Sequence, residues 1–441
     1  MTLDTINVKT DYENYQHLVQ TQGLVPNQRV AGEFTKVKKG LVKDKMRFLF
    51  PSNWIFHDQI VEKVLEGDYF GIMPYCAEFV TTMNCSNRCE IPCGYKLQKI
   101  MEEVWEKNNS QNPRVHMQNI EFAKNLLDRL INGGVKGMIF TGGGEPFLFK
   151  GLEDLVARAS EQGVDSVVYT NGNAVSEKRI RKLIQAQPLL VRVSLNAGTK
   201  EVYDRFHMPM NKKGAFQRTL NTIKSFAEAS IQNPRMSLGI GVVINEINRH
   251  DLVETAQRIR EIIDKTKGGI EFVTYRPAFN YCGISQLQSE LLDETYEIVE
   301  RDVKRELSNT GIKVLNIVCR YDALKQDTRN YDKCRATNLY AELSPRGTLH
   351  LCCERNCHRD YVIGDLTQST LEEIWKSKRR KSAIDWINAS SCATCPPACK
   401  PHETNKQFNK IEELRKAGEF YKVRVWIEEQ RKMPKPKMVN F

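Results

Sequence analysis

The chain lacks long apolar runs. Nowhere in its 441 residues does an uninterrupted stretch of about 18 apolar residues occur, which is the length that a membrane-spanning helix needs. Its first 16 residues are polar and mixed in charge, and they lack the apolar core of a secretory signal. We therefore expect a cytoplasmic protein that has no membrane partner.

The sequence also lacks internal repeats, low-complexity segments and basic motifs interleaved with aromatic residues. Its formal net charge of +11 is strongly positive, with local peaks at residues 36–47 and 432–437. Such a balance can attract nucleic acid, acidic peptides or phosphorylated molecules. Because no nucleic-acid motif accompanies the charge, we expect a solvated basic surface and no nucleic-acid partner.

Cysteine, by contrast, is abundant, with 13 in the chain. Cytoplasmic thiol pools disfavour structural disulfides, so clustered cysteines in that compartment more often bind metals or carry out chemistry. Three lie between Cys85 and Cys93, and seven lie between Cys334 and Cys399. This clustering is the first indication of function.

Strand and helix patterns alternate over residues 75–279. Short apolar segments alternate with amphipathic helical stretches, which is typical of a parallel sheet covered by helices. We expect strands near 76–84, 137–141, 165–172, 189–198, 236–246 and 269–277, and helices at 120–131, 151–162, 177–187, 214–229 and 250–265. Outside this region we expect helices at 57–66, 291–307, 370–377, 407–415 and 423–430, and a strand at 313–320.

Polar or glycine-rich patches follow several of these strands directly. They are the cysteine loop and residues 143–145, 170–172, 194–196 and 245–246. The carboxyl ends of parallel strands meet at one edge of a sheet, and active sites of such folds lie there. The sequence therefore predicts a functional site at that edge.

The cysteine loop reads Cys85-Ser-Asn-Arg-Cys89-Glu-Ile-Pro-Cys93. Three thiolates within nine residues can converge on one metal centre. Four thiolates saturate a 4Fe–4S cubane, whereas three leave one iron open for a ligand. On spacing alone, a structural zinc site with a ligand from elsewhere, or three unrelated thiols, remain alternatives.

Five sequence pieces together resemble the radical S-adenosylmethionine (SAM) superfamily over residues 76–405. They are the cysteine loop, TGGGEP at 141–146, YTNG at 169–172, VSLNAG at 193–198 and GVVINEIN at 241–248. The resemblance implies an α/β fold, a partial (β/α)6 TIM-like barrel. It also implies a 4Fe–4S cluster and SAM, which is reductively cleaved to a 5′-deoxyadenosyl radical that abstracts hydrogen from a substrate.

The resemblance also assigns residues to SAM. It places Gly143, Gly144 and Glu145 at the amino group, and Ser194 and Asn196 near the ribose or carboxylate. Glycine lets a backbone carbonyl approach a ligand closely, and Glu145 offers an acceptor to an ammonium group. Asn171 and residues 241–245, including Asn245, would line the adenosyl pocket, and Arg205 and His207 are further candidates for the SAM carboxylate, with a surface role as the alternative.

The cysteine spacing departs from the usual pattern of the superfamily. Three residues and then two usually separate the cysteines, whereas here three residues separate Cys89 from Cys93 as well. This CxxxCxxxC spacing resembles a variant found in radical SAM enzymes of aminoglycoside biosynthesis. Cys76 is the only spare cysteine nearby, and we expect it to be buried in a packing role.

The second cysteine cluster resembles the C-terminal extension called SPASM in its full form and twitch in its truncated form. The shared features are Cys334, Gly347, Cys352 and the segment IGDLTQSTLEEIWKS. Two auxiliary clusters need cysteines after Cys399, and the last 42 residues contain none, so we expect one auxiliary 4Fe–4S cluster. The implied ligands are Cys334, Cys352, Cys392 and Cys395, with Cys399, Cys357 or Cys353 as alternates, and a zinc ribbon is the alternative site.

A few other residues are candidates for completing the chemistry. Cys282 follows the sixth expected strand and could donate a hydrogen atom, or simply pack; Cys319 is a weaker candidate for the same role. Arg276 lies at a strand end, where it could bind a carboxylate of the substrate or of SAM, or form a structural salt bridge. Tyr95 could shield the cluster.

Three functional hypotheses follow. The first is a radical SAM enzyme that acts on a sugar or aminocyclitol metabolite by dehydration, oxidation or epimerisation. The second keeps the chemistry but modifies a ribosomally made peptide; in both, we expect a flavodoxin- or ferredoxin-type electron donor. The third is a non-catalytic zinc or iron–sulfur module for electron transfer or binding, which the glycine-rich strand ends disfavour.

The expected organisation has five parts. They are an N-terminal extension without an assigned role (1–74), a radical SAM core (75–285), a connecting helix and strand (286–325), a small cysteine-rich twitch or SPASM domain (326–405) and a basic helical tail (406–441).

Overall fold

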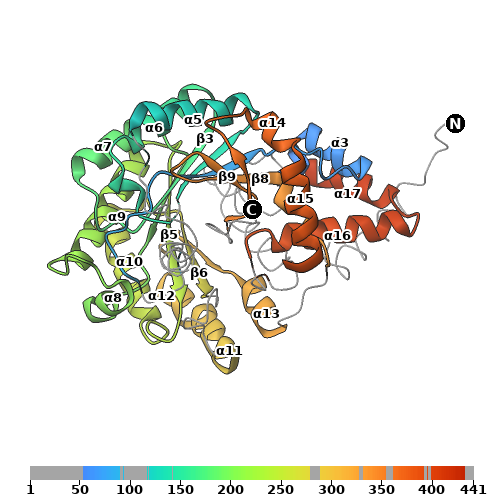
Figure 1. Ribbon diagram of the computed structural model, residues 1–441. Helices are drawn as coiled ribbons and strands as arrows, with labels where there is room; N and C mark the ends of the chain where they lie inside the picture. The colour runs from blue at the N-terminus through green and yellow to red at the C-terminus, as the bar shows by residue number, and fades with distance from the viewer. Residues whose placement is uncertain are drawn as a thin grey trace.

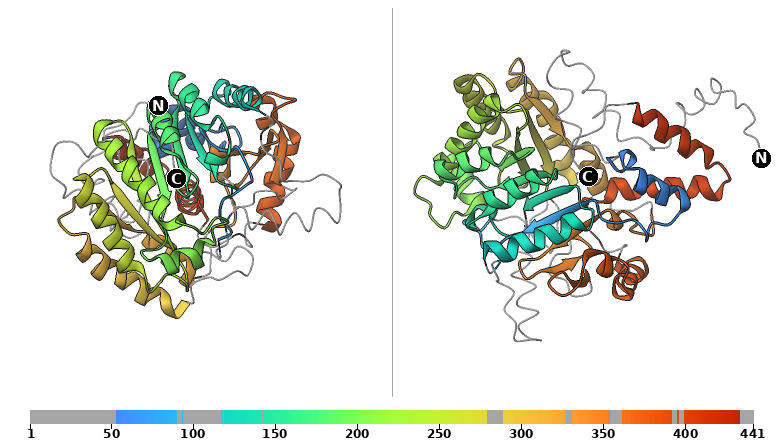
Figure 2. Two further views of the ribbon diagram at one scale, coloured as in Figure 1. Left: turned by 90° about the vertical axis from the view of Figure 1, so that its left-hand side faces the viewer. Right: turned by 90° about the horizontal axis from the view of Figure 1, so that it is seen from above.

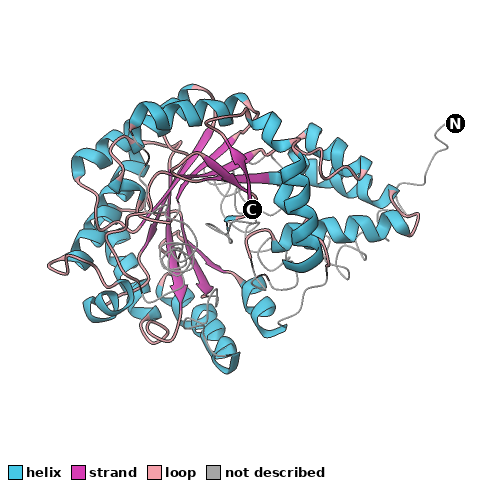
Figure 3. Ribbon diagram, in the orientation of Figure 1, coloured by secondary structure: helices cyan, strands magenta, loops and turns pink. Residues whose placement is uncertain are grey.

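The computed structural model describes residues 53–89, 119–141, 143–278, 289–326, 331–353, 361–391 and 399–432, with the single residues 93, 117 and 395. Ten of its strands form one curved sheet in the order β10-β9-β8-β1-β2-β3-β4-β5-β6-β7 (Figure 3). Strand β8 and strands β1 to β7 run parallel, and β9 and β10 are antiparallel additions. The strands are β1 (Cys76–Val80), β2 (Gly137–Thr141), β3 (Asp165–Thr170), β4 (Leu190–Ser194), β5 (Ser237–Ile244), β6 (Phe272–Pro277), β7 (Lys313–Asn316), β8 (Tyr340–Leu343), β9 (Thr348–His350) and β10 (Val362–Asp365).

Helices cover the outer face of this sheet (Figure 1). The expected alternation of strands and helices is confirmed, and the open parallel sheet agrees with the expected partial barrel. The helices that follow the strands of the core are α5 (Ile120–Asn132), α6 (Leu152–Glu161), α7 (Glu177–Gln185), α8 (Lys200–His207), α9 (Ala215–Gln232), α10 (Leu252–Thr266) and α11 (Ser289–Ile298), the last continued by the π-helical turn η4 (Val299–Val303) and by α12 (Lys304–Glu306).

Helix α5 illustrates why these segments are helical. Ala123, Leu127 and Leu130 recur at helical spacing, and all three are buried against the sheet. The Asn119 side chain caps the start of the helix by accepting a hydrogen bond from Phe122 N at 2.8 Å. The helix ends at Asn132, before Gly133.

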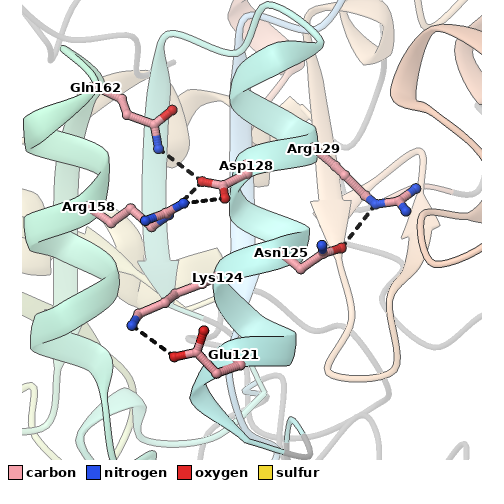
Figure 4. Close-up of polar contacts among 7 residues, drawn as sticks. All are labelled: Glu121, Lys124, Asn125, Asp128, Arg129, Arg158 and Gln162. Carbon is pink, nitrogen blue, oxygen red and sulfur yellow. Dashed lines mark hydrogen bonds and ion pairs between the residues drawn. The ribbon is translucent and has the colours of Figure 1, made fainter.

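Polar contacts join α5 to α6 on the surface (Figure 4). Both oxygens of Asp128 accept hydrogen bonds of 2.6 Å from Arg158, and Gln162 donates a third at 2.9 Å. The hydrogen bond from Arg158 holds the pKa of Asp128 below its usual value. Exposed pairs of this kind contribute little free energy, so the apolar faces of the two helices hold them together.

Alternate residues of each strand enter two separate apolar cores. In β4, Val191 and Val193 pack with the outer helices, whereas Leu190 points to the inner face. Leu190 joins Ile139, Val167 and Phe272, which lie toward the amino ends of neighbouring strands. The inner face is therefore apolar at its amino end.

Segments from both ends of the described chain cover this amino end. They are η2 (Asn53–Phe56), α3 (Asp58–Glu66), α16 (His402–Lys416) and α17 (Tyr421–Arg431), and Figure 2 shows α3 against the C-terminal helices. Trp54 Nε1 donates to Gln407 Oε1 at 3.1 Å, and Tyr69 OH donates to Glu412 Oε1 at 2.9 Å. The expected helix near 57–66 is confirmed, and it packs on the C-terminal tail.

The cysteine-rich region is continuous with the core sheet. Strand β8 pairs with β1, with Cys76 opposite Tyr340 and Glu78 opposite Glu342. The expected helix at 370–377 corresponds to α14 (Leu371–Trp375), and a further helix follows it, α15 (Lys378–Trp386). The sheet therefore continues past residue 326, where the expected twitch or SPASM domain begins, and the expected division into five parts stays a prediction.

The strand expected at 313–320 is wrong in its second half. Strand β7 ends at Asn316, and α13 (Val318–Gln326) follows it. The Asn316 side chain donates to the carbonyl of Tyr296 at 3.2 Å and to Glu300 Oε1 at 3.1 Å, which fixes this strand end against α11 and η4. Tertiary contacts thus override the β-branched pattern that suggested a longer strand.

In the part of the chain that the structure describes, no helix has both the length and the apolar character required to cross a bilayer.

Arg415 provides a test of how the ends of the chain support the core. Its guanidinium donates to the carbonyls of Val64 at 2.7 Å and Leu65 at 3.1 Å, which lie in the last turn of α3. We expect Arg415→Met, which keeps the stem that packs on Phe420, to lower the free energy of unfolding by about 1–3 kcal/mol. The measurement is urea unfolding. Lys416→Met on the same helix is the matched control, and equal stability of the two variants would contradict the prediction.

Candidate active site

The cysteine loop is fixed to the turn that follows β2. The amide of Glu145 donates to the carbonyl of Asn84 at 2.7 Å. A Cβ atom on Gly144 would lie 2.0 Å from that same carbonyl oxygen, so only glycine fits at this position. The glycine-rich turn and the loop that carries Cys85 are therefore in direct contact.

The Glu145 carboxylate links the ends of β2 and β3. It accepts hydrogen bonds from Thr170 Oγ1 at 2.7 Å, from Asn171 N at 2.7 Å and from Phe147 N at 3.2 Å. The side chain is 2% exposed, and burial raises the pKa of Glu145 above its usual value. Because the carboxylate already accepts three protein hydrogen bonds, it orients the site, and its assignment to the SAM amino group stays a prediction.

Asparagine side chains after β3 hold the cysteine loop from the other side. Asn171 Nδ2 donates to Ser86 Oγ at 3.0 Å and lies 3.7 Å from Cys85 Sγ. Asn173 Nδ2 donates to Asn87 Oδ1 at 3.1 Å. Together with the contact of Glu145, these hydrogen bonds bring two of the expected strand-end patches, residues 143–145 and 170–172, next to the cysteine loop.

The loop cysteines have different surroundings. Burial, together with the charges of Glu145 and Cys93, raises the pKa of Cys85 to about 12. Cys89 Sγ lies 3.4 Å from His207 Nδ1. Thiols bind iron as thiolates, so metal loading releases these protons.

His207 connects Cys89 to the end of β4. It is 2% exposed, and burial lowers the pKa of His207 to about 4. Its Nε2 lies 3.0 Å from the Leu195 carbonyl, and Asn196 Nδ2 is 3.4 Å away. Arg205, on the same helix, is exposed. His207 thus lies behind the cysteine loop, and the contact expected of Arg205 with SAM stays a prediction.

The ends of β4 and β5 are also joined by asparagines. Asn196, whose φ is 58°, accepts a hydrogen bond from Val243 N at 2.8 Å. Asn248 Nδ2 donates to the Asn196 carbonyl at 2.7 Å, and Asn248 Oδ1 accepts from Asn245 N at 2.8 Å. Asn245 is fully buried, and its Nδ2 has no hydrogen-bond partner among the described residues. A buried donor of this kind fits a site that receives a polar ligand.

The predicted SAM residues thus converge at one end of the sheet. Glu145, Asn171 and Asn196 are connected to the cysteine loop by the contacts above, and Ser194 is half-buried at the end of β4. Arg276 lies on β6, opposite Val243 of β5. Cys282 and Tyr95 lie outside the described residues, as does the side chain of Cys319.

The second cysteine cluster gathers around Tyr340 of β8. Burial raises the pKa of Tyr340, and the cysteines at 352, 353, 334 and 399 add to that increase, so all four are its electrostatic neighbours. Asn405 Nδ2 lies 3.2 Å from Cys334 Sγ. Cys395 is half-buried, and Cys392 and Cys357 lie outside the described residues. The structure thus brings Cys399 and Cys353 together with two of the predicted ligands, and the full ligand set stays a prediction.

No three His, Cys, Asp or Glu side chains within the described ranges converge closely enough to hold a single metal ion. The thiolates of a 4Fe–4S cubane bond to separate irons, so a cluster does not require them to meet at one point. Both cysteine sets therefore remain suited to cubane ligation by their donor chemistry.

An ion pair connects the two cysteine regions. Lys400, next to Cys399, pairs with Glu78 on the inner face of β1. Glu78 is 6% exposed, so the pair is largely buried. Sequence reasoning missed this contact, and the signal available was a glutamate at an inner position of an otherwise apolar strand.

Arg179 of α7 supports the glycine-rich turn from outside. It forms hydrogen bonds of 2.5 Å and 2.8 Å to the two oxygens of Glu153, and it donates to the carbonyls of Phe147 and Phe149. Glu153 is 5% exposed. Phe147 also donates its amide to Glu145, so this buried pair holds the segment that orients Glu145.

Comparisons with known proteins agree with this geometry. Residues 79–259 match the family model of the Radical SAM superfamily, and residues 334–396 match that of an iron–sulfur cluster-binding domain, SPASM. A Fe-coproporphyrin III synthase of Methanosarcina barkeri is 30% identical over 39% of this chain and 39% of that protein. The dTDP-4-amino-4,6-dideoxy-D-glucose ammonia-lyase of Streptomyces venezuelae is 28% identical over 36% of this chain and 32% of that protein.

The matches to these two relatives thus span about two fifths or less of their length. Among solved structures, Streptococcus suis SuiB bound to S-adenosylmethionine superposes with a TM-score of 0.54 at 14% identity, covering 77% of this chain and 75% of that one. This likeness concerns the fold.

Substitution of Arg179 tests whether the Arg179–Glu153 pair supports the turn. Arg179→Met leaves the Glu153 carboxylate buried without its partner, and we expect the free energy of unfolding to fall by about 3 kcal/mol. Arg181→Met, an exposed position on the same helix, is the matched control. Denaturant unfolding measures both, and the double variant Glu153→Met with Arg179→Met should recover part of the loss. A loss no larger than that of Arg181→Met would contradict the prediction.

Proposed function

Because this chain belongs to the radical SAM superfamily and carries a C-terminal SPASM iron–sulfur domain, we propose that it abstracts hydrogen from a sugar- or aminocyclitol-type metabolite. The net reaction is a dehydration, an oxidation or an epimerisation. The observation that carries the proposal is the contact of the cysteine loop with the Gly144–Glu145 turn at the carboxyl end of the sheet.

Two further observations favour a sugar-type substrate. The spacing of Cys85, Cys89 and Cys93 resembles the variant of aminoglycoside biosynthesis, and one relative is named for a dTDP-linked amino sugar. The short cysteine-rich region suits a single auxiliary cluster. Membership in an enzyme superfamily also disfavours a non-catalytic binding module.

The proposed roles of the residues at the active site are as follows. Cys85, Cys89 and Cys93 hold the first 4Fe–4S cluster, and the ends of β2 to β5 hold SAM. A cluster with one open iron, together with SAM, supplies a 5′-deoxyadenosyl radical on reduction. Glu145 and Asn196 keep the strand ends in register, so that the ligands on different strands act at one place.

The auxiliary cluster belongs to the second cysteine set. Cys334, Cys352, Cys392 and Cys395 are the proposed ligands, with Cys399 in place of Cys392 as the alternative. Four protein thiolates would leave no iron open to substrate, so a cluster held there would supply electron relay. A flavodoxin- or ferredoxin-type protein is the proposed reductant.

A second candidate is the modification of a ribosomally made peptide. The net charge of +11 favours it, because a basic surface attracts an acidic peptide. Deuterium transfer into 5′-deoxyadenosine separates the two: deuterated nucleotide-linked sugars or aminocyclitols label it under the first proposal, and a deuterated acidic peptide labels it under the second.

Removal of one loop cysteine tests the chemistry directly. We expect Cys89→Ala to abolish the release of 5′-deoxyadenosine from SAM and dithionite, because two thiolates do not hold the cluster. Cys76→Ala, a buried cysteine of β1, is the matched control and should retain cleavage. The proposal is wrong if Cys89→Ala still cleaves SAM.

Iron content tests the auxiliary cluster. Anaerobic reconstitution should give about eight irons per chain, from two 4Fe–4S clusters, and Cys334→Ala should lower this to about four. About four irons in the unmodified protein would show that no auxiliary cluster is present. Stoichiometric zinc would show that the second cysteine set is a zinc site instead.

A further inference from the structure

The inner face of the sheet changes character along the strands. At the amino end it is apolar, because Val167 and Leu190 belong to the inner apolar core. One step toward the carboxyl end, Tyr169 of β3 lies opposite Arg192 of β4. Further along come Ser194 and the loop residues of the cofactor end. Arg192 therefore lies between the apolar residues at the amino end of the inner face and the cofactor site at its carboxyl end.

The Arg192 side chain extends toward the cofactor end. Its own backbone pairs with Gly239 of β5, but Nε and Cδ lie 3.6 Å and 3.7 Å from the position of a Cβ on Gly241. Gly241 pairs with Ser194, which is one inner position closer to the carboxyl end. Gly241 has no side chain at this inner position of β5, so the arginine side chain lies over it, whereas the ring of Phe272 fills the space over Gly239.

Tyr169 fixes the orientation of the guanidinium. The central carbon of Arg192 lies 3.8 Å from the centroid of the Tyr169 ring, which is the geometry of cation–π stacking. Stacking covers one face of the planar group and leaves its N–H edge available for hydrogen bonds. Such an edge binds oxyanions through two parallel hydrogen bonds.

No carboxylate of the described residues forms an ion pair with Arg192, and its buried Nε has no hydrogen-bond partner there. The inner-face carboxylates are on other strands: Glu78 of β1 pairs with Lys400, and Glu342 lies opposite Glu78 on β8, so neither is on a strand next to β4. A half-buried cation without a counter-ion costs free energy that an anionic ligand would offset. The guanidinium is thus available to bind an anion.

We propose that Arg192, held by Tyr169, binds an oxyanion group of the substrate, a carboxylate or a phosphoryl group. The inference rests on the proposed function, and it narrows the substrate class. A nucleotide-linked or phosphorylated sugar, or an acidic peptide, carries such a group. A free aminocyclitol carries amines instead, and Arg192 disfavours it.

Binding of small anions tests the inference without turnover. The reconstituted protein is titrated with pyrophosphate, phosphate and acetate, observed by ³¹P and ¹³C line broadening. We expect saturable binding that Arg192→Gln weakens by about tenfold or more, since each charge-assisted hydrogen bond contributes strongly. Arg192→Lys should fall between the two. A preference for phosphate and pyrophosphate over acetate assigns a phosphoryl group, and the reverse assigns a carboxylate.

Two controls separate substrate binding from cofactor binding and from general charge. Arg181→Gln removes an exposed arginine of α7 and should leave anion binding unchanged. Arg192→Gln should leave the KM for SAM and the uncoupled release of 5′-deoxyadenosine unchanged, which also shows that the variant folds. If instead its KM for SAM rises, Arg192 binds the SAM carboxylate and the inference is overturned.

Two other results also overturn the inference. One is equal anion binding by Arg192→Gln and the unmodified protein; the other is no saturable binding by the unmodified protein. A failure of the unmodified protein to cleave SAM refutes the proposed function, whereas the anion titrations need no cleavage. The two failures are therefore distinguishable.

Discussion

The close contact between Gly144 and the Asn84 carbonyl is the constraint on which the site depends. No side chain larger than hydrogen fits there, so the turn after β2 and the cysteine loop after β1 meet backbone to backbone. The Glu145 carboxylate then links this turn to the end of β3 by accepting hydrogen bonds from Thr170 and Asn171. Asn196 joins the ends of β4 and β5 in a similar way. The cysteine loop is held by hydrogen bonds to the segments that follow β2, β3 and β4.

The same sheet links this site to the second cysteine cluster. Because β8 pairs with β1, the four cysteines around Tyr340 lie beside the strand that leads into the cysteine loop. The buried pair of Lys400 and Glu78 crosses the same boundary. A continuous sheet would keep clusters held by the two cysteine sets at a fixed separation, as the proposed electron relay requires.

Much of the core could be predicted from local pattern. Each strand from β1 to β5 carries a short apolar run that is followed by glycine or asparagine, so both its existence and its polar carboxyl end were visible. The place of β8 beside β1 was not, because pairing across more than 250 residues leaves no periodic trace. Local pattern also does not single out Arg192, a charge within the apolar run of β4. Its importance depends on Tyr169 and Gly241, which only the register of three strands brings together.

Segments from the two ends of the described chain cover the amino end of the barrel. Trp54 meets Gln407 across 353 positions of sequence, and Arg415 meets Val64 across 351. During synthesis the strands of the core leave the ribosome long before α16 does. Until then the apolar residues at the amino ends of the strands are exposed to water, and such surface is prone to aggregate. The core is therefore complete only after the last helices of the described chain have been made and have packed on it.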